Sequence, residues 1–188
     1  MLKIVIYDNN YPYHALTALI MATHAKSQLH KLDRYDRQLL RALQDDGGLT
    51  NLQLAEQVGL SPSPCSRRVQ KLEEAGIILR RAVLLDQKAL GLDLTAIIQI
   101  SMDRHTPERF EHFENTVRGF EEVQQCYLVT GQDADYLLKV AVPDMDAYQQ
   151  FLLNKVTRIE GVSGVHSSFV MRKVVDTTAL PLGYLTQS

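Results

Sequence analysis

The chain has 188 residues, of which 45% are hydrophobic and 22% charged, so its composition is globular and its length allows two small domains. Its formal net charge is −2, yet residues 1–92 carry 12 Lys and Arg against 9 Asp and Glu, whereas residues 93–188 carry 8 against 13; only the first half is suited to meet phosphate. No apolar run reaches the roughly 18 residues that cross a bilayer, so we expect no membrane segment. Cys65 and Cys126 have neither a metal-ligand spacing nor the partners of a disulfide framework. We therefore expect a cytoplasmic protein without a metal.

Residues 1–31 precede the first capped helix and are expected to form an N-terminal arm. Asp8, Asn9 and Pro12 interrupt the apolar residues near the start, and no convincing cleavage site follows, so the segment does not fit a secretion signal. From Met21 onward the sequence is that of an ordinary short polar arm. Two interpretations stay open, a partly disordered arm or a natural protein that begins at Met21.

The next segment predicts two short helices that are marked by their caps. Asp33 can cap a helix to about Asp46, where a Gly-Gly pair ends it. Thr50 or Asn51 can cap the second helix, and Gly59 permits the tight turn that follows. The residues expected to face inward are Leu39, Leu40 and Leu43 in the first helix and Leu52, Leu54, Ala55 and Val58 in the second.

A third helix begins with the sequence Ser-Pro-Ser-Pro, in which Ser61 is the expected N-cap. Proline lacks an amide hydrogen and is tolerated in the first turn, so the two prolines mark a start. Cys65, Val69 and Leu72 recur at helical spacing and form an inward stripe, and Gly76 ends the helix. Two helices, a turn and a third helix are the order of a helix-turn-helix domain, whose last helix enters the major groove.

Polar and cationic residues lie off this stripe and are the candidate DNA contacts. Serine hydroxyls can donate to phosphate or base edges, and arginine can bind guanine or the backbone. Residues 77–86 read as a strand that would bring two more arginines to the duplex as a small wing. The alternative is a solvated charged face without a ligand. The candidate DNA-binding residues are Ser61, Ser63, Ser66, Arg67, Arg68, Gln70, Lys71, Arg80 and Arg81.

The run "LDRYDRQLLRALQDDGGLTNLQLAEQVGLSPSPCSRRVQKLEEAGII", residues 32–78, resembles the DNA-binding domain of the leucine-responsive and asparagine-responsive regulators, the Lrp/AsnC family. Its most specific element is "VGLSPSPCSRRVQKLEEAGI". The resemblance continues to about Leu182 and includes "TTALPL", which is similar to members that govern amino-acid catabolism. It implies a sequence-specific transcription regulator that binds double-stranded DNA, responds to leucine or a related amino acid, and assembles with itself as a dimer or higher even oligomer.

The second half changes from helical spacing to strand alternation. Its βαββαβ order predicts a ferredoxin-like split fold, so the fold class is α+β with a winged helix-turn-helix in front. The expected elements are a strand Leu94–Met102, a helix opened by Thr106 and Pro107, strands Val123–Thr130 and Tyr136–Val142, a helix from about Asp144 to Ile159, and a strand Val165–Val174. The resemblance implies that this module binds the effector and joins subunits.

The loop "TGQDADY" before the third of these strands contains Asp133 and Asp135. Paired acids in a Gly-containing hairpin are typical of a turn, and no nucleophile or base accompanies them for catalysis. The resemblance offers another interpretation, since the family's Gly-x-x-Asp-Tyr loop lines the effector pocket. Gly131 and Asp135 carry over directly, and Gln132 and Asp133 are further candidates for effector binding in the same loop, which is one residue longer here.

The alternatives to this function are a metal site, a nucleoid-like DNA-binding protein and an enzyme. His105 and His112 match no compact metal site and are expected on the surface. A nucleoid-like protein with weak sequence choice would use the same phosphate contacts. An enzyme on the ferredoxin-like half would need catalytic residues that the sequence does not show, so we expect no catalytic residue and no cofactor other than the amino-acid effector.

These patterns divide the chain into five parts. We expect an arm at 1–31, a winged helix-turn-helix at 32–82, a linker strand at 83–92, a ferredoxin-like effector and oligomerisation domain at 93–178, and a tail at 179–188.

Overall fold

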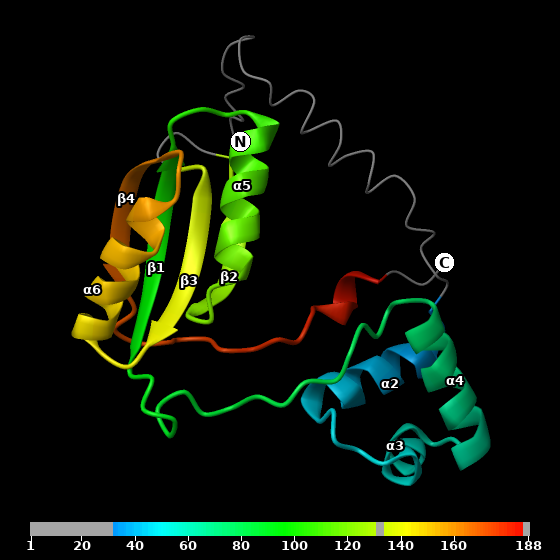
Figure 1. The fold of residues 1–188 in the computed structure, drawn as a ribbon. Helices are drawn as coiled ribbons and strands as arrows, with labels where there is room; N and C mark the ends of the chain where they lie inside the picture. Colours follow the sequence, from blue (N-terminus) through cyan, green and yellow to red (C-terminus); the bar gives the residue numbers. More distant parts are fainter. Residues whose placement is uncertain (1–31, 131–133, 186–188) are drawn as a thin grey trace, which may run out of the picture. The chain divides into compact units, whose positions relative to one another are not determined.

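The computed structural model describes residues 32–130 and 134–185. It forms two compact units (Figure 1), one from the chain up to Leu84 together with Val175 onward, and one from Leu85 to Val174. The chain therefore leaves the first unit, builds the second and returns to the first. Within the described residues, no helix is long and apolar enough to cross a membrane.

The first unit contains the expected helices α2 (Arg34–Asp45), α3 (Asn51–Val58) and α4 (Pro62–Glu74). The Asp33 side chain accepts from the amides of Tyr35 and Asp36 and so caps α2, and Thr50 caps α3 through the amide of Gln53. Such caps satisfy the first amides of a helix, which have no partner within it. The inward residues pack as one core of Leu39, Ala42, Leu54, Ala55, Val58, Cys65 and Val69.

The turn between α3 and α4 has the predicted geometry. Gly59 adopts φ 71°, the left-handed region that favours glycine, and the Leu60 amide donates to the Ala55 carbonyl at 2.9 Å. The Asn51 side chain donates to the Pro62 carbonyl at 2.9 Å, which ties the start of α3 to the start of α4. The expectation for Leu52 was wrong, because this side chain is exposed on the far side of α3.

The strand expected at residues 77–86 does not form, and neither does a strand at 83–92. A strand must exchange hydrogen bonds with a neighbour, and none of the described residues pairs with this segment. Leu79 and Val83 are 88% and 85% exposed. Residues 87–91 instead form a turn closed by a 3.0 Å bond from the Leu92 amide to the Gln87 carbonyl.

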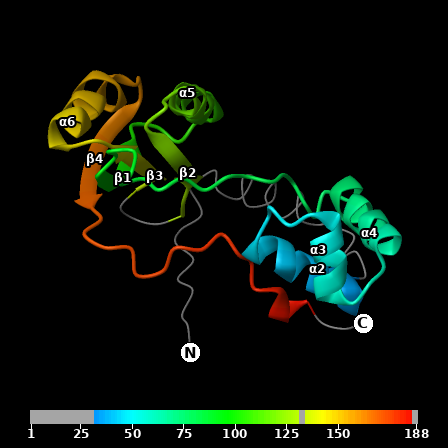
Figure 2. The same ribbon diagram turned by 90° about the horizontal axis from the view of Figure 1, so that it is seen from below.

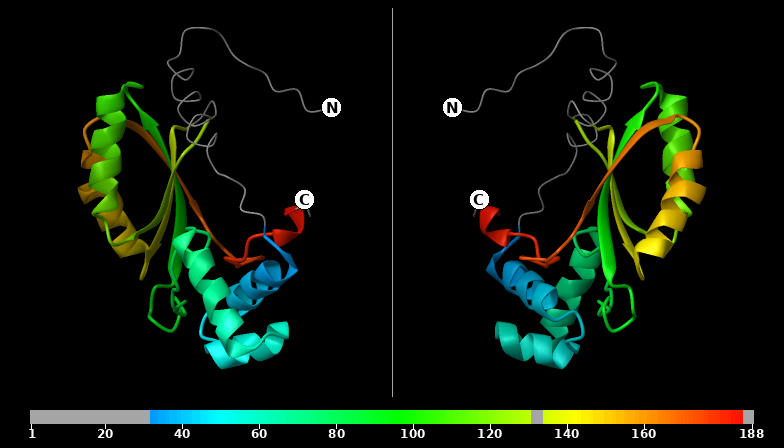
Figure 3. Two further views of the ribbon diagram at one scale, coloured as in Figure 1. Left: turned by 90° about the vertical axis from the view of Figure 1, so that its right-hand side faces the viewer. Right: turned by 90° about the vertical axis from the view of Figure 1, so that its left-hand side faces the viewer.

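The second unit has the predicted βαββαβ order. Its antiparallel sheet is arranged β2-β3-β1-β4, and Figure 3 shows both helices on one side of it. The strands are β1 (Leu94–Met102), β2 (Val123–Leu128), β3 (Tyr136–Val142) and β4 (Val162–Phe169), and the helices are α5 (Pro107–Arg118) and α6 (Met145–Asn154). This arrangement confirms the ferredoxin-like fold.

Two elements differ from their expected bounds by more than two residues. Helix α6 ends at Asn154 and a short 3-10 helix, η1 (Val156–Arg158), follows it, so the helix does not continue to Ile159. Strand β4 begins at Val162 and ends at Phe169, earlier than the expected 165–174, because it is aligned by its pairing with β1 from Met102 to Ala96. Register with a neighbour sets such ends.

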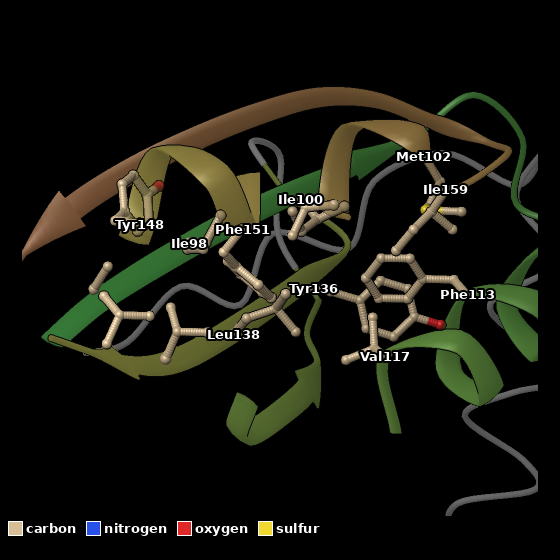
Figure 4. Close-up of a cluster of buried hydrophobic side chains, with 14 of the residues drawn as sticks. Ile98, Ile100, Met102, Phe113, Val117, Tyr136, Leu138, Tyr148, Phe151 and Ile159 are labelled. Carbon is tan, nitrogen blue, oxygen red and sulfur yellow. The ribbon is translucent and has the colours of Figure 1, made fainter. Parts of the chain in front are cut away.

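The helices cover the sheet with an apolar core that Figure 4 shows. Alternate residues of β1 and β3 point toward α5 and α6, where they meet Phe113, Val117 and Phe151. The opposite face is mixed in character, with Thr95 buried under Gln87, whose side chain donates to the Thr95 hydroxyl at 2.9 Å.

The C-terminal segment packs with the first unit. The side-chain amide of Gln44 on α2 donates to the Leu180 carbonyl at 3.3 Å and accepts from the Leu180 amide at 2.7 Å. The short helix η2 (Leu182–Tyr184) follows and lies beside α2 in Figure 2. This double hydrogen bond joins residues that are 136 positions apart in the chain.

Candidate DNA-binding helix and effector domain

Helix α4 turns its polar residues outward and its apolar stripe inward. Cys65, Val69 and Leu72 are buried, as predicted. The exposed residues of this helix and its cap include Ser61, Ser63, Ser66, Arg67, Gln70 and Lys71. The structure therefore brings these candidate DNA contacts together on the solvent side of one helix that is anchored by the core beneath it.

The start of α4 offers hydroxyl groups rather than a cluster of amides. The first four amide positions of a helix have no acceptor inside it and can bind an anion. Here two of those positions are Pro62 and Pro64, which carry no amide hydrogen. The Ser61 side chain makes no cap bond, so its hydroxyl is available to a ligand. Serine and arginine side chains would thus supply most of the donors at this end.

Arg68 does not point outward with its neighbour. Its guanidinium lies 2.7 Å from the Asp33 carboxylate and 2.8 Å from that of Asp36, both at the start of α2. Burial raises the pKa of Asp33, but hydrogen bonds from the Asp36 amide and from Arg68 outweigh burial and lower it below its ordinary value. These contacts join α4 to the start of α2, so the guanidinium of Arg68, a candidate DNA contact, is already paired within the fold.

Arg67 is the cation of α4 that stays available. It is exposed and forms no ion pair with any residue in the described ranges. Gln70 donates to Glu74 at 2.8 Å along the same helix, so its amide is partly committed. Among the side chains of α4, Arg67 and Lys71 are therefore the long cations best placed to reach a phosphate or a base.

Arg80 and Arg81 are not carried on a wing. Both are exposed on the extended segment after Gly76, and Arg81 lies 3.8 Å from Glu73 of α4. Arg81 thus remains next to the end of α4, although neither residue is carried by a strand.

The loop that is predicted to bind the effector is described only in part. Gly131, Gln132 and Asp133 lie outside the described residues. Asp135 is 7% exposed and its two oxygens are used within the fold: one accepts from the Met102 amide at 2.7 Å and the other lies 2.7 Å from Nε2 of His105. Its carboxylate therefore fastens the loop to the end of β1.

His112 is exposed as expected, and His105 is partly exposed. The His105 ring is half-buried between Asp135 and the edge of Phe110, with ring centroids 6.0 Å apart. Sequence reasoning missed this pair because its members are 30 positions apart and meet only through the pairing of β1 with β3. No group of three metal-ligating side chains occurs in the described parts of the chain.

Each unit matches a known domain family. Residues 32–78 match the model of a winged helix-turn-helix DNA-binding domain, and residues 95–180 match that of the Lrp/AsnC ligand binding domain. The chain belongs to the Lrp/AsnC family. The leucine-responsive regulatory protein of Escherichia coli K12 is 42% identical over 149 residues, which are 79% of this chain and 90% of that protein.

Solved structures give the same result for this Lrp/AsnC regulator. A transcriptional regulator from Neisseria meningitidis, crystallised as a complex with L-methionine, is 42% identical with a TM-score of 0.79 over 82% of this chain and 99% of that chain. An AsnC family regulator from Agrobacterium tumefaciens is 43% identical with a TM-score of 0.77 over the same shares. The family resemblance, the α+β fold and the class of transcription regulator are thereby confirmed.

The two family models match the segments that contain some of the candidate residues and not others. The helix-turn-helix match ends at residue 78, so Arg80 and Arg81 lie beyond it, whereas every candidate on α4 lies within it. The ligand-binding match includes Asp135 and both of its partners, Met102 and His105.

Proposed function

We propose that this Lrp/AsnC regulator reads a specific DNA sequence with α4 and changes its DNA binding when a free amino acid binds its second unit. The proposal of DNA binding is supported by the outward face of α4, where Arg67, Lys71 and Ser66 are exposed above a buried apolar stripe. A helix of this kind presents side chains to base edges in the major groove, and its serines and lysines also contact phosphate.

The amino-acid half of the proposal is supported by the matched ligand-binding domain and by the Neisseria relative in complex with L-methionine. Leucine remains the other candidate, since the Escherichia coli relative is a leucine-responsive protein. The relatives named above are regulators, which supports a regulator rather than an enzyme.

The small size of one helix-turn-helix domain favours assembly of several chains. One helix-turn-helix contacts few base pairs, and useful affinity takes two heads on half-sites about 34–36 Å apart or multiples of that. We therefore propose a dimer or higher even oligomer, which light scattering coupled to size exclusion measures directly.

Specific DNA binding is tested by selecting duplexes from a random pool. The affinity of the protein for selected and scrambled duplexes is then measured at one fixed salt concentration. A sequence-specific regulator should bind the selected duplex at least about 10³-fold more tightly than a scrambled duplex of equal length. A ratio close to one would favour the nucleoid-like alternative, because phosphate contacts alone carry no sequence information.

The test of the effector half is a thermal-shift screen of the twenty amino acids. A ligand that binds only the native state raises its apparent stability. At least one amino acid, with leucine and methionine the first candidates, should raise the melting temperature and alter affinity for the selected duplex. A flat screen would contradict the amino-acid response.

A further inference from the structure

Two segments of the chain connect the two units (Figure 1). Residues 79–86 follow the helix-turn-helix, and residues 171–179 lead back to it after β4. Both segments are exposed along their whole length. Any chain of two domains needs the first connection, whereas the second exists only because the C-terminal segment returns to the first unit.

Both connections are fixed to the second unit at one residue. Thr95, at the start of β1, is buried. Its hydroxyl accepts a 2.9 Å hydrogen bond from the side chain of Gln87, just after the first connection. Its carbonyl accepts a 2.9 Å bond from the amide of Val170, just before the second connection. The two connections therefore leave the sheet from the same place.

At their other ends, the connections reach different helices of the first unit. The Ile78 amide donates to the Leu72 carbonyl at 3.1 Å, which fixes the first connection to the end of α4. Gln44 on α2 exchanges two hydrogen bonds of 2.7 and 3.3 Å with the backbone of Leu180. A body that is held at two separate points has less rotational freedom than a body that is held at one.

The C-terminal segment has local structure that suits it to this attachment. The Thr177 hydroxyl accepts from the Ala179 amide at 3.1 Å, a turn that side-chain hydroxyls commonly form. Pro181 restricts the backbone that follows, and the 3-10 helix η2 comes next. These residues include the motif "TTALPL", which belongs neither to α4 nor to the sheet of the second unit. A segment that is already ordered loses less conformational entropy when it docks.

The attachment at Gln44 is weak enough to open. Two hydrogen bonds between uncharged groups hold it, and the Leu180 side chain is 70% exposed, so little apolar burial adds to them. The net stabilisation by such bonds is small, because water competes for the same groups. Contacts of this strength open locally without global unfolding.

We propose that residues 175–185 are a strap that restrains the helix-turn-helix unit, and that release of the strap at Gln44 leaves this unit on one connection. The docked strap limits the motion of α4 relative to the second unit. Its consequence for DNA rests on the function and assembly proposed above: two restrained helix-turn-helix units accept a narrower range of half-site spacings than two released units.

Time-resolved fluorescence anisotropy of the full chain tests the restraint without DNA. A dye is attached at the exposed Glu56 of α3, as Glu56→Cys in a Cys126→Ser background. Beyond the local motion of the dye, a docked strap should leave only the slow rotation of the whole protein. A released strap should add a faster phase from rotation of the first unit alone.

Three further substitutions in the labelled chain separate the strap from unspecific effects. Gln44→Ala removes both bonds and should add the faster phase. Leu180→Ala keeps both bonds, because they are made by the backbone, and should behave as the labelled parent chain does. Gln38→Ala, at an exposed glutamine on the same helix, is the matched control. Thermal unfolding of each variant verifies that it is folded.

The anisotropy decides the strap, and DNA binding decides its consequence. A faster phase of equal amplitude in the labelled parent chain and Gln44→Ala, or in neither, would overturn the strap. On duplexes with two half-sites, wild type should bind one spacing at least about 10-fold more tightly than a spacing half a helical turn longer, and Gln44→Ala should lower this preference to less than about 3-fold.

The two measurements fail separately. An unchanged spacing preference in Gln44→Ala would overturn the effect of the strap on DNA binding. If the wild-type chain binds no duplex specifically, the proposed function fails, whereas the anisotropy result still decides the strap.

Discussion

At the scale of single residues, two adjacent arginines have different surroundings and therefore different expected roles. Arg68 contacts two carboxylates at the start of α2, whereas Arg67 has no ion pair within the described ranges. We expect Arg68→Ala to lower the free energy of unfolding by about 1 kcal/mol, the upper range for a partly exposed pair, and Arg67→Ala to change it by less than about 0.5 kcal/mol. Urea denaturation measures both, and equal losses would contradict this assignment.

The same contact predicts a dependence of stability on pH. The pKa of Asp33 is lower in the folded chain than its ordinary value, so the folded state favours the carboxylate. Its contribution is complete above the unfolded pKa, about 3.9, and is lost as the pH falls through the folded pKa. Wild type should therefore be more stable than Asp33→Asn at pH 7, and the gap should narrow below about pH 4. A gap that stays constant between pH 7 and pH 3 would refute the pairing.

At the scale of elements, the structure attaches the C-terminal segment to α2 through Gln44. Gln44→Ala removes both bonds to the Leu180 backbone, and the Leu180 amide should then exchange with solvent at close to the rate of an unprotected amide. Gln38→Ala, an exposed glutamine on the same helix, serves as the matched control and should leave that amide protected. Equal exchange at Leu180 in wild type and Gln44→Ala would contradict the attachment.

Elements whose causes are local could be predicted from the sequence. Asp33, Thr50 and Thr106 cap their helices as expected, because a cap depends on residues two or three positions away. The expected strand at 77–86 failed because pairing depends on a distant neighbour that the local pattern does not reveal. Arg68 with Asp36 and His105 with Asp135 are 32 and 30 positions apart, so neither pair was predictable without the fold.

At the scale of the whole molecule, one Lrp/AsnC chain contains a helix-turn-helix unit and a ligand-binding unit. The chain passes between the two units twice, since residues from Val175 onward belong with the first unit. A ligand can shift DNA binding only if it binds differently to the two states of the protein. The amino acid should therefore change the affinity for the selected duplex, and DNA should change the affinity for the amino acid by the same factor.

A substitution of Arg67 decides whether α4 contacts bases. Wild type and Arg67→Ala would be titrated, at one salt concentration, against the selected duplex and every single-base variant of it. Loss of a base-reading arginine should cost about 1–3 kcal/mol on the selected duplex and should remove the preference at one position of each half-site. Unchanged affinity and unchanged preference at every position would contradict the assignment of α4 as the reading helix.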